Sequence, residues 1–265
     1  MKISRLNHLG QGRVFAVSEL YGHFPALNLW LDKVRFQPST DRVVLLGNFL
    51  GFAPSSRQAT FYLTKPWISA VLGRNEADVL ARLEGRKAVH QTLIGQWLSM
   101  MDEVAVAHLH SALKAIPVAI EWESLGGTVV FSQAPLPADQ DWSCLKSELE
   151  NTECPISGVN AFMSRIDILG CLGRLGKGPD RHALGVSWSI SGYSVERIER
   201  PFFMHKNRII VPSSTKIAQD SCYDTRCVIG SLDVTAFTNK NEIDTCHIDI
   251  LPELYPTKTF STKQH

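Results

Sequence analysis

Residues 13–22 read RVFAVSELYG, an apolar β-branched run that passes directly into a polar turn closed by glycine. The run at 13–17 is predicted to be a buried strand. Two later stretches repeat the arrangement, VVLLGNFLGFA at 43–53 and WISAVLGRNE at 67–76. Amphipathic segments separate the three runs, so the order of elements is β-α-β-α-β, which is typical of a parallel sheet.

The segments between these strands have helical patterns. Four apolar residues recur at steps of three, four and three, and predict one buried helix face: Phe24, Leu27, Leu31 and Val34. Residues 55–63 predict a shorter helix that ends near Pro66. Because parallel strands carry their site at their carboxyl ends, we expect the loops 18–22, 47–53 and 73–76 to converge on it.

The rest of the chain continues the α/β pattern. Residues 77–113 are predicted to be mainly helical, and 118–123 and 128–131 to be short strands. Residues 135–155 predict a long loop or a partly helical insertion. Four β-rich runs follow, at 183–189, 207–211, 226–229 and 245–250. No repeat or linker divides the chain, so we expect one domain over residues 1–265.

The composition indicates an ordinary globular protein. The chain has 265 residues, 44% of them hydrophobic and 20% charged, with a net charge of +1. That balance calls for neither nucleic acid nor an anionic membrane as a partner. No apolar stretch is long enough for a signal peptide or a bilayer span. The six cysteines form no C-x-x-C pair, which favours reduced thiols in a cytoplasm, although Cys222 and Cys227 could bridge or bind metal.

The three loops and their flanks resemble the phosphoprotein phosphatase family of calcineurin-like metallophosphoesterases, in particular its compact bacterial and phage serine/threonine members. That family carries G-D-x-H-G, G-D-x-x-D-R-G and G-N-H-E after its first three strands. Here the loops read SELYG, GNFLGFA and GRNE. The match covers about residues 11–80 and is thinner beyond. It implies an α/β, metallophosphatase-type sandwich of two mixed β-sheets flanked by helices.

The resemblance also implies that the metal site is degenerate. In the family, two divalent metals such as Mn²⁺ activate a water and neutralise the phosphoryl charge. The first five replaced positions follow from the loop spacing. Glu19 stands at the first aspartate, Tyr21 at the first histidine, Asn48 at the bridging aspartate, Arg74 at the ligand asparagine, and Asn75 at the histidine that resembles the general acid.

Later positions depart from the family in the same way. Gln133 stands at the histidine of a His-Ala strand end, and Tyr193 at the last ligand histidine. Phe52 replaces the arginine of Asp-Arg-Gly. Glu76 keeps the glutamate of G-N-H-E, and Arg165 resembles a phosphate-gripping arginine in a Trp-x-Arg segment. The pattern implies no resident metal cofactor.

Arg74 brings a permanent positive charge to a metal position. Turned inward, it could replace a metal by pairing with Glu19 or Glu76. It could equally turn to solvent, or form with Arg165 an anion pocket that binds phosphorylated peptide without cleaving it. The candidate ligand-binding residues are therefore the vestigial-site positions Glu19, Asn48, Arg74, Asn75, Glu76 and Arg165, with Tyr21, Gln133 and Tyr193.

The resemblance, with its losses, predicts a pseudophosphatase that binds or regulates a protein partner and catalyses nothing. One alternative is an active phosphatase or phosphoesterase with a divergent site, using one metal through Glu19, Asn48 and Glu76. Another is a structural subunit of a larger assembly that uses the outer face of the scaffold. Stoichiometric metal with turnover would separate the first alternative from the rest.

Overall fold

A computed structural model describes most of the chain: residues 3–8, 12–87, 96–136, 140–151, 182–195, 203–205, 207–217, 225–235 and 245–250. The strands in this part are β1 (Ile3–Arg5), β2 (Val14–Val17), β3 (Arg42–Leu45), β4 (Ile68–Ala70), β5 (Ala119–Ser124), β6 (Gly127–Ser132), β7 (Trp188–Val195), β8 (Phe203–His205), β9 (Arg208–Ile217), β10 (Thr225–Asp233) and β11 (Thr245–Ile250).

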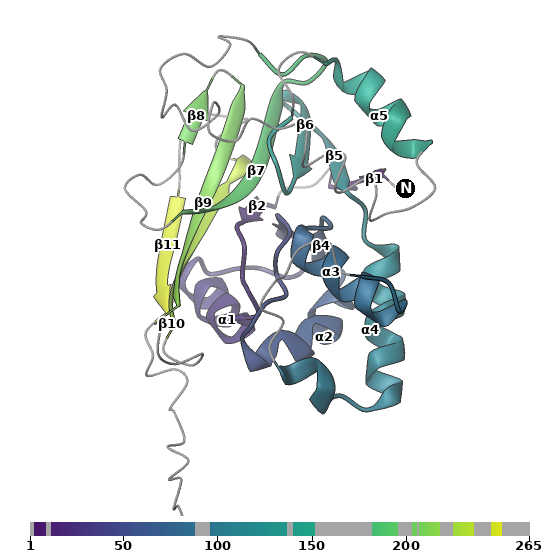
Figure 1. Ribbon diagram of the computed structural model, residues 1–265. Helices are drawn as coiled ribbons and strands as arrows, with labels where there is room; N and C mark the ends of the chain where they lie inside the picture. The colour runs from purple at the N-terminus through teal and green to yellow at the C-terminus, as the bar shows by residue number, and fades with distance from the viewer. Residues whose placement is uncertain are drawn as a thin grey trace, which may run out of the picture.

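The helices begin and end close to the predicted segments. They are α1 (Phe24–Lys33), the 3₁₀ helix η1 (Pro54–Gln58), α2 (Ala59–Leu63), α3 (Arg74–Leu83), the 3₁₀ helix η2 (Gln96–Met100), α4 (Glu103–Ala115) and α5 (Trp142–Glu150). Figure 1 shows α1 to α4 grouped beside β2, β3 and β4, with α5 apart from them. None of the helices in the described residues has the length and apolarity that a bilayer crossing requires.

The described strands form one hydrogen-bonded path in the order β1-β5-β6-β7-β9-β10-β2-β3-β4, with β8 on β9 and β11 on β10. The predicted parallel unit is confirmed, because β2 pairs with β3 and β3 with β4 in parallel register. On its side away from β11, β10 pairs with β9 at one end and with β2 at the other. β10 thereby connects the two halves of the path.

Alternation along the strands divides the apolar core into two clusters. On β2, Val14 and Ala16 belong to one cluster, and Phe15 and Val17 to the other. The first cluster also contains buried residues of β5, β6, β7 and β9. The second is completed by the helices. The strand path therefore folds over itself into two mixed layers that enclose one cluster, and helices cover the other.

Two expectations about the helices need refinement. On α1 the third fully buried large side chain is Trp30, while Leu31 and Val34 are only half-buried. Trp30 is drawn inward because its indole N–H donates to Ser231 Oγ on β10, at 2.7 Å. The expected helix at 55–63 begins as 3₁₀ and becomes α-helical only at Ala59.

The run at 183–189 is strand only from Trp188 onward. The preceding loop is held by the Asn207 side chain, which accepts from the Ala183 N–H and donates to the carbonyls of Ala183 and Val186. These bonds replace the sheet ladder that the sequence pattern predicts there. The short strand β1 was absent from the sequence expectations altogether.

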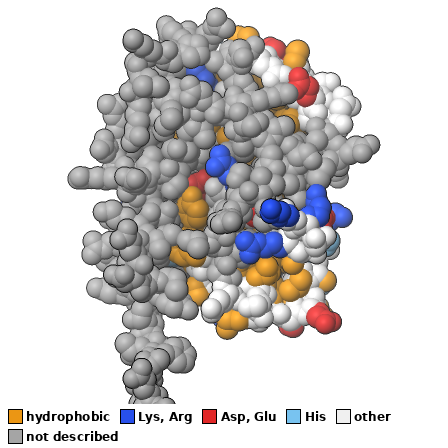
Figure 2. All heavy atoms as spheres, in the orientation of Figure 1, with side chains coloured by type: hydrophobic (Ala, Val, Ile, Leu, Met, Phe, Trp, Pro, Cys, Tyr) orange, Lys and Arg blue, Asp and Glu red, His pale blue; other side chains and the backbone are white. Residues whose placement is uncertain are grey.

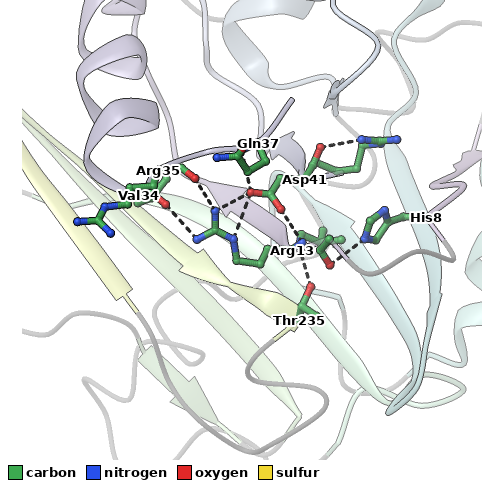
Figure 3. A network of polar contacts seen from close by, with 10 residues as sticks. His8, Arg13, Val34, Arg35, Gln37, Asp41 and Thr235 are labelled. Atoms are coloured by element: carbon green, nitrogen blue, oxygen red, sulfur yellow. Dashed lines mark hydrogen bonds and ion pairs between the residues drawn. The ribbon is translucent and has the colours of Figure 1, made fainter. Parts of the chain in front are cut away.

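A polar cluster fastens α1 to the start of β2 and β3 (Figure 3). The Arg13 guanidinium donates to Asp41 Oδ2 at 2.6 Å and to the carbonyls of Val34 and Arg35, at the end of α1. The Arg13 backbone N–H donates to the other carboxylate oxygen at 2.9 Å. This cluster lies at the opposite ends of β2 and β3 from the loops described next.

Candidate functional site

The three predicted loops meet at the carboxyl ends of β2, β3 and β4. The backbone N–H of Tyr21 donates to the Asn48 carbonyl at 2.9 Å, and that of Gly22 to the Phe49 carbonyl at 2.7 Å. The Leu50 N–H donates to the Glu76 carboxylate at 2.8 Å. The structure thus brings loops 18–22, 47–53 and 73–76 together.

Glu19 is the centre of the site. Its side chain is buried, and three neutral side chains donate to its carboxylate. Asn48 Nδ2 lies 2.5 Å and Gln133 Nε2 3.0 Å from Oε1, while the Tyr21 hydroxyl lies 2.8 Å from Oε2. The sequence resemblance aligns these donors with the family's bridging aspartate and two of its ligand histidines. The Glu19 carboxylate thus accepts hydrogen bonds from side chains that the resemblance assigns to metal-ligand positions.

The orientation of the Asn48 amide follows from its neighbours. Its Oδ1 accepts the backbone N–H of Asn75 at 3.0 Å, a group that can only donate. The amide nitrogen must then face Glu19. Asn48 also adopts a left-handed backbone, with φ of 48°, which asparagine tolerates better than most residues.

Tyr21 adopts a strained backbone beside this amide. Its φ is also 48°, a left-handed value that is uncommon for a bulky residue. Such strain persists only where the surrounding structure imposes it, and it is concentrated at functional sites. The hydroxyl bond to Glu19 and the backbone bond to Asn48 together hold Tyr21 in place.

Two glycines make the close approach of the loops possible. A Cβ on Gly47 would lie 2.6 Å from Gln133 Cγ, and Gly47 itself has a φ of +79°. A Cβ on Gly73 would lie 2.4 Å from the Asn48 nitrogen. Any side chain at either position would therefore separate the donors from Glu19.

Glu76 is buried and holds the second and third loops together. Its carboxylate accepts the backbone N–H groups of Asn48 at 2.8 Å, Leu50 at 2.8 Å and Gly73 at 2.9 Å. Burial raises the pKa of Glu76 to about 7, although these N–H groups favour the ionised form. Glu76, in the first turn of α3, therefore accepts hydrogen bonds from the backbone, whereas Glu19 accepts them from side chains.

Asn75 does not resemble a general acid in its contacts. Its side chain is buried, and its Nδ2 donates to the Leu50 carbonyl at 2.7 Å. An amide has no proton to release near neutral pH, so it cannot serve as the acid that protonates a leaving group. At this position the chain has a further bond between the second and third loops.

Arg74 forms neither of the ion pairs expected for a metal substitute. Within the part of the chain that the structure describes, it makes no hydrogen bond or ion pair to Glu19 or Glu76, and its buried Nε has no partner. Among the described residues, neutral groups donate to both carboxylates. The hypothesis that Arg74 substitutes for a metal by pairing with either carboxylate is therefore wrong.

Two candidate residues cannot be placed in the site. Arg165 lies outside the described residues, as do Cys222 and the segment resembling Trp-x-Arg. Tyr193 is on β7, where it pairs in parallel register with Pro212 of β9, and its backbone alone is described. The expected anion pocket of two arginines consequently remains a prediction.

Aromatic side chains adjoin the first two loops. Phe52, in place of the family arginine, stacks on Tyr21 with ring centroids 6.3 Å apart and meets the His23 ring edge-on at 5.5 Å. His23 is buried, and burial lowers its pKa to about 4. Sequence reasoning missed His23, although its position directly after the Tyr-Gly turn and before α1 marked it as a neighbour of the site.

Trp97, a buried residue of η2, also reaches these loops. Its indole N–H donates to the Gly51 carbonyl at 2.7 Å. Trp97 comes from η2, far along the chain, so no local sequence pattern pointed to this contact.

The donor set does not fit two divalent metals. Glu19 faces N–H and O–H donors, the Asn48 oxygen accepts an N–H, and no imidazole stands at the positions of Tyr21 or Gln133. Among the residues whose placement is described, no three His, Cys, Asp or Glu side chains are arranged to hold a metal ion. A cation at Glu19 would have to displace bonded donors.

Comparison with known proteins supports the fold. No family model matches the sequence. The chain is similar to serine/threonine-protein phosphatase 1 of Salmonella typhimurium, with 26% identity over 129 residues, which are 47% of this chain and 60% of the relative. The match thus spans less than two thirds of the curated relative's length.

Two solved structures have the same architecture. A candidate diadenosine tetraphosphatase aligns with a TM-score of 0.51 and 16% identity, over 94% of this chain and 97% of the other. A protein serine/threonine phosphatase from Saccharomyces cerevisiae aligns with a TM-score of 0.53 and 11% identity, over 94% and 84%. The predicted calcineurin-like phosphoesterase fold, a sandwich of two mixed layers flanked by helices, is confirmed.

Proposed function

We propose that this protein is a pseudophosphatase, a non-catalytic protein that binds another protein on a serine/threonine phosphatase scaffold and holds no metal cofactor. One observation carries the proposal: the side chains at the family's ligand positions are bonded to one another around Glu19. Hydrolysis in this fold requires metals that activate a water, and these bonds consume the oxygens that would hold them. Fold likeness alone conveys no activity.

A phosphatase assay tests the loss of catalysis. Purified full-length protein is given Mn²⁺ with an aryl phosphate and with phosphoserine peptide, and Glu19→Ala serves as the matched variant. We expect turnover no higher than the buffer rate for both proteins. Turnover that Glu19→Ala abolishes would favour the alternative of an active enzyme with a divergent site.

We propose that Arg74 contacts the partner, beside the three loops at the carboxyl ends of β2, β3 and β4. It is half-buried at the start of α3, and it makes no hydrogen bond or ion pair with any described residue. A guanidinium without a partner is well suited to bind a carboxylate or phosphate group of another protein. The proposed partner therefore presents an acidic or phosphorylated group to Arg74.

A second candidate, a structural subunit, is favoured by exposed apolar side chains on the helices. Phe61 on α2, Met100 on η2 and Val104 on α4 are exposed to 58%, 72% and 65%. Elements α2 and α4 are in contact. Figure 2 shows hydrophobic side chains close to basic ones on this face of the molecule. Exposed apolar groups that lie together are typical of a protein interface.

Affinity capture with three variants distinguishes the two surfaces. Tagged protein is used as bait in the cytoplasmic fraction of the native host, because the sequence predicts a cytoplasmic protein. We expect Arg74→Ala to lose a specific partner at least about tenfold, as for a hydrogen bond to a charged group. Arg82→Ala removes an exposed arginine from the same helix, and should retain the partner.

The third variant is Phe61→Ser, which tests the outer face. Loss of the partner with Phe61→Ser and retention with Arg74→Ala would identify a structural subunit and contradict the Arg74 proposal. Retention by all three variants would contradict both surfaces.

A further inference from the structure

The Glu19 cluster joins the two layers of the sandwich. Glu19 follows β2 and Asn48 follows β3, both in the layer that the helices cover, whereas Gln133 follows β6 in the other layer. The bonds from Asn48 and Gln133 end on the same carboxylate oxygen, at 2.5 and 3.0 Å. One buried acceptor therefore connects the layers at their carboxyl ends.

The described side chains that donate to the Glu19 carboxylate are neutral. Each of Tyr21, Asn48 and Gln133 supplies an N–H or O–H without a charge. Buried carboxylates usually require a cation or several donors, and three donors to Glu19 are present here without a metal.

We infer that the Glu19 cluster holds the two layers together without a metal, and that the Asn48 amide is the group that prevents divalent cations from binding at Glu19. The inference shares its site with the proposed function, but it concerns stability and does not depend on a partner.

A single substitution should reverse this property. With Asn48→Asp, a carboxylate oxygen would stand about as close to Glu19 Oε1 as the amide nitrogen does now, 2.5 Å. Two carboxylates at that separation cannot both ionise without a cation between them. The same substitution would place an acceptor in the position of the present donor. The variant should therefore fold poorly without metal and regain stability when a divalent cation binds.

Thermal unfolding of the protein tests this, measured in EDTA and in about 1 mM Mn²⁺. That concentration lies above the dissociation constants typical of Ca²⁺ sensor sites. We expect the wild-type melting temperature to be the same in both buffers. For Asn48→Asp we expect a loss of at least about 4 °C in EDTA, and recovery of about half of it in Mn²⁺. The double variant Glu19→Gln with Asn48→Asp removes the carboxylate pair, so its melting temperature should not respond to Mn²⁺.

Stabilisation of the wild type by Mn²⁺, or an Asn48→Asp melting temperature equal to the wild type in EDTA, would overturn the inference. Should Asn48→Asp fail to fold, titration calorimetry of Mn²⁺ into the wild type decides, and saturable binding would overturn it. Melting temperatures and Mn²⁺ binding are measured without a partner protein. Failure of this inference is therefore distinct from failure of the partner proposal, which would appear only in the capture experiment.

Discussion

At position 76 one buried carboxylate organises two loops. Its two oxygens accept three backbone N–H groups, those of Asn48, Leu50 and Gly73. Glu76→Gln would replace one oxygen by an NH₂ group facing N–H donors. We expect a loss of about 1–3 kcal/mol in the free energy of unfolding, because at least one buried N–H loses its acceptor.

Chemical denaturation by urea measures this loss, with Glu103→Gln as the matched control. Glu103 is an exposed glutamate in the first turn of α4, and its substitution should change stability by less than about 0.5 kcal/mol. Equal stability of the two variants would show that the Glu76 bonds contribute nothing.

The sequence predicted the positions of the site residues better than their contacts. Glu19, Asn48 and Arg74 could be assigned to strand ends because strand periodicity and loop length are local properties. The orientation of the Asn48 amide could not be predicted from the sequence, because it depends on the Asn75 N–H at the start of α3. For the same reason Arg74 was expected to meet a carboxylate that neutral donors already satisfy.

The fastening of α1 to its strands depends on Asp41, which immediately precedes β3. The carboxylate accepts from the Arg13 side chain, the Arg13 N–H and the Gln37 N–H. Burial alone would raise the pKa of Asp41, but these bonds and the Arg13 charge lower it below 3.8. Figure 3 shows the guanidinium reaching from this carboxylate to the carbonyls of Val34 and Arg35, directly after α1.

We expect Asp41→Asn to destabilise the protein by about 1–3 kcal/mol at pH 7, because the amide loses a charge-assisted pair with Arg13. The lowered pKa means that the stability contributed by Asp41 is present above pH 3.8 and is lost as the pH falls below it. Urea denaturation at pH 7 and pH 3 measures both effects. As a control, Asp32→Asn removes an exposed acid from the end of α1. If it lowered the free energy of unfolding as much as Asp41→Asn, the role of the Arg13 pair would be contradicted.

Over the whole molecule, local and distant pairings differed in how well the sequence predicted them. The unit of β2, β3 and β4 was predictable because each strand and its helix are adjacent in the chain. The pairing of β10 with β2 joins residues far apart in sequence, and the two runs of residues contain no information on which strand each pairs with or in which direction. The layered sandwich was instead implied by family resemblance.

Two buried groups near the site give the molecule a distinctive dependence of stability on pH. His23 has a pKa lowered from 6.5 to about 4, so between these values the unfolded chain binds the extra proton and stability rises with pH. Glu76 has a pKa raised from 4.5 to about 7, so between these values the folded chain holds the extra proton and stability falls with pH. The two slopes oppose each other from pH 4.5 to 6.5.

From these two groups we therefore expect the wild-type melting temperature to be nearly flat from pH 4.5 to 6.5 and to fall between pH 6.5 and 7, where Glu76 is the one of the two that still titrates. His23→Gln should convert the plateau into a continuous decline, because the rising contribution is lost. Glu76→Gln should give a rise up to pH 6.5 and no fall beyond it. Scanning calorimetry from pH 4 to 8 measures all three curves, and curves of the same shape would mean that neither group carries the linkage.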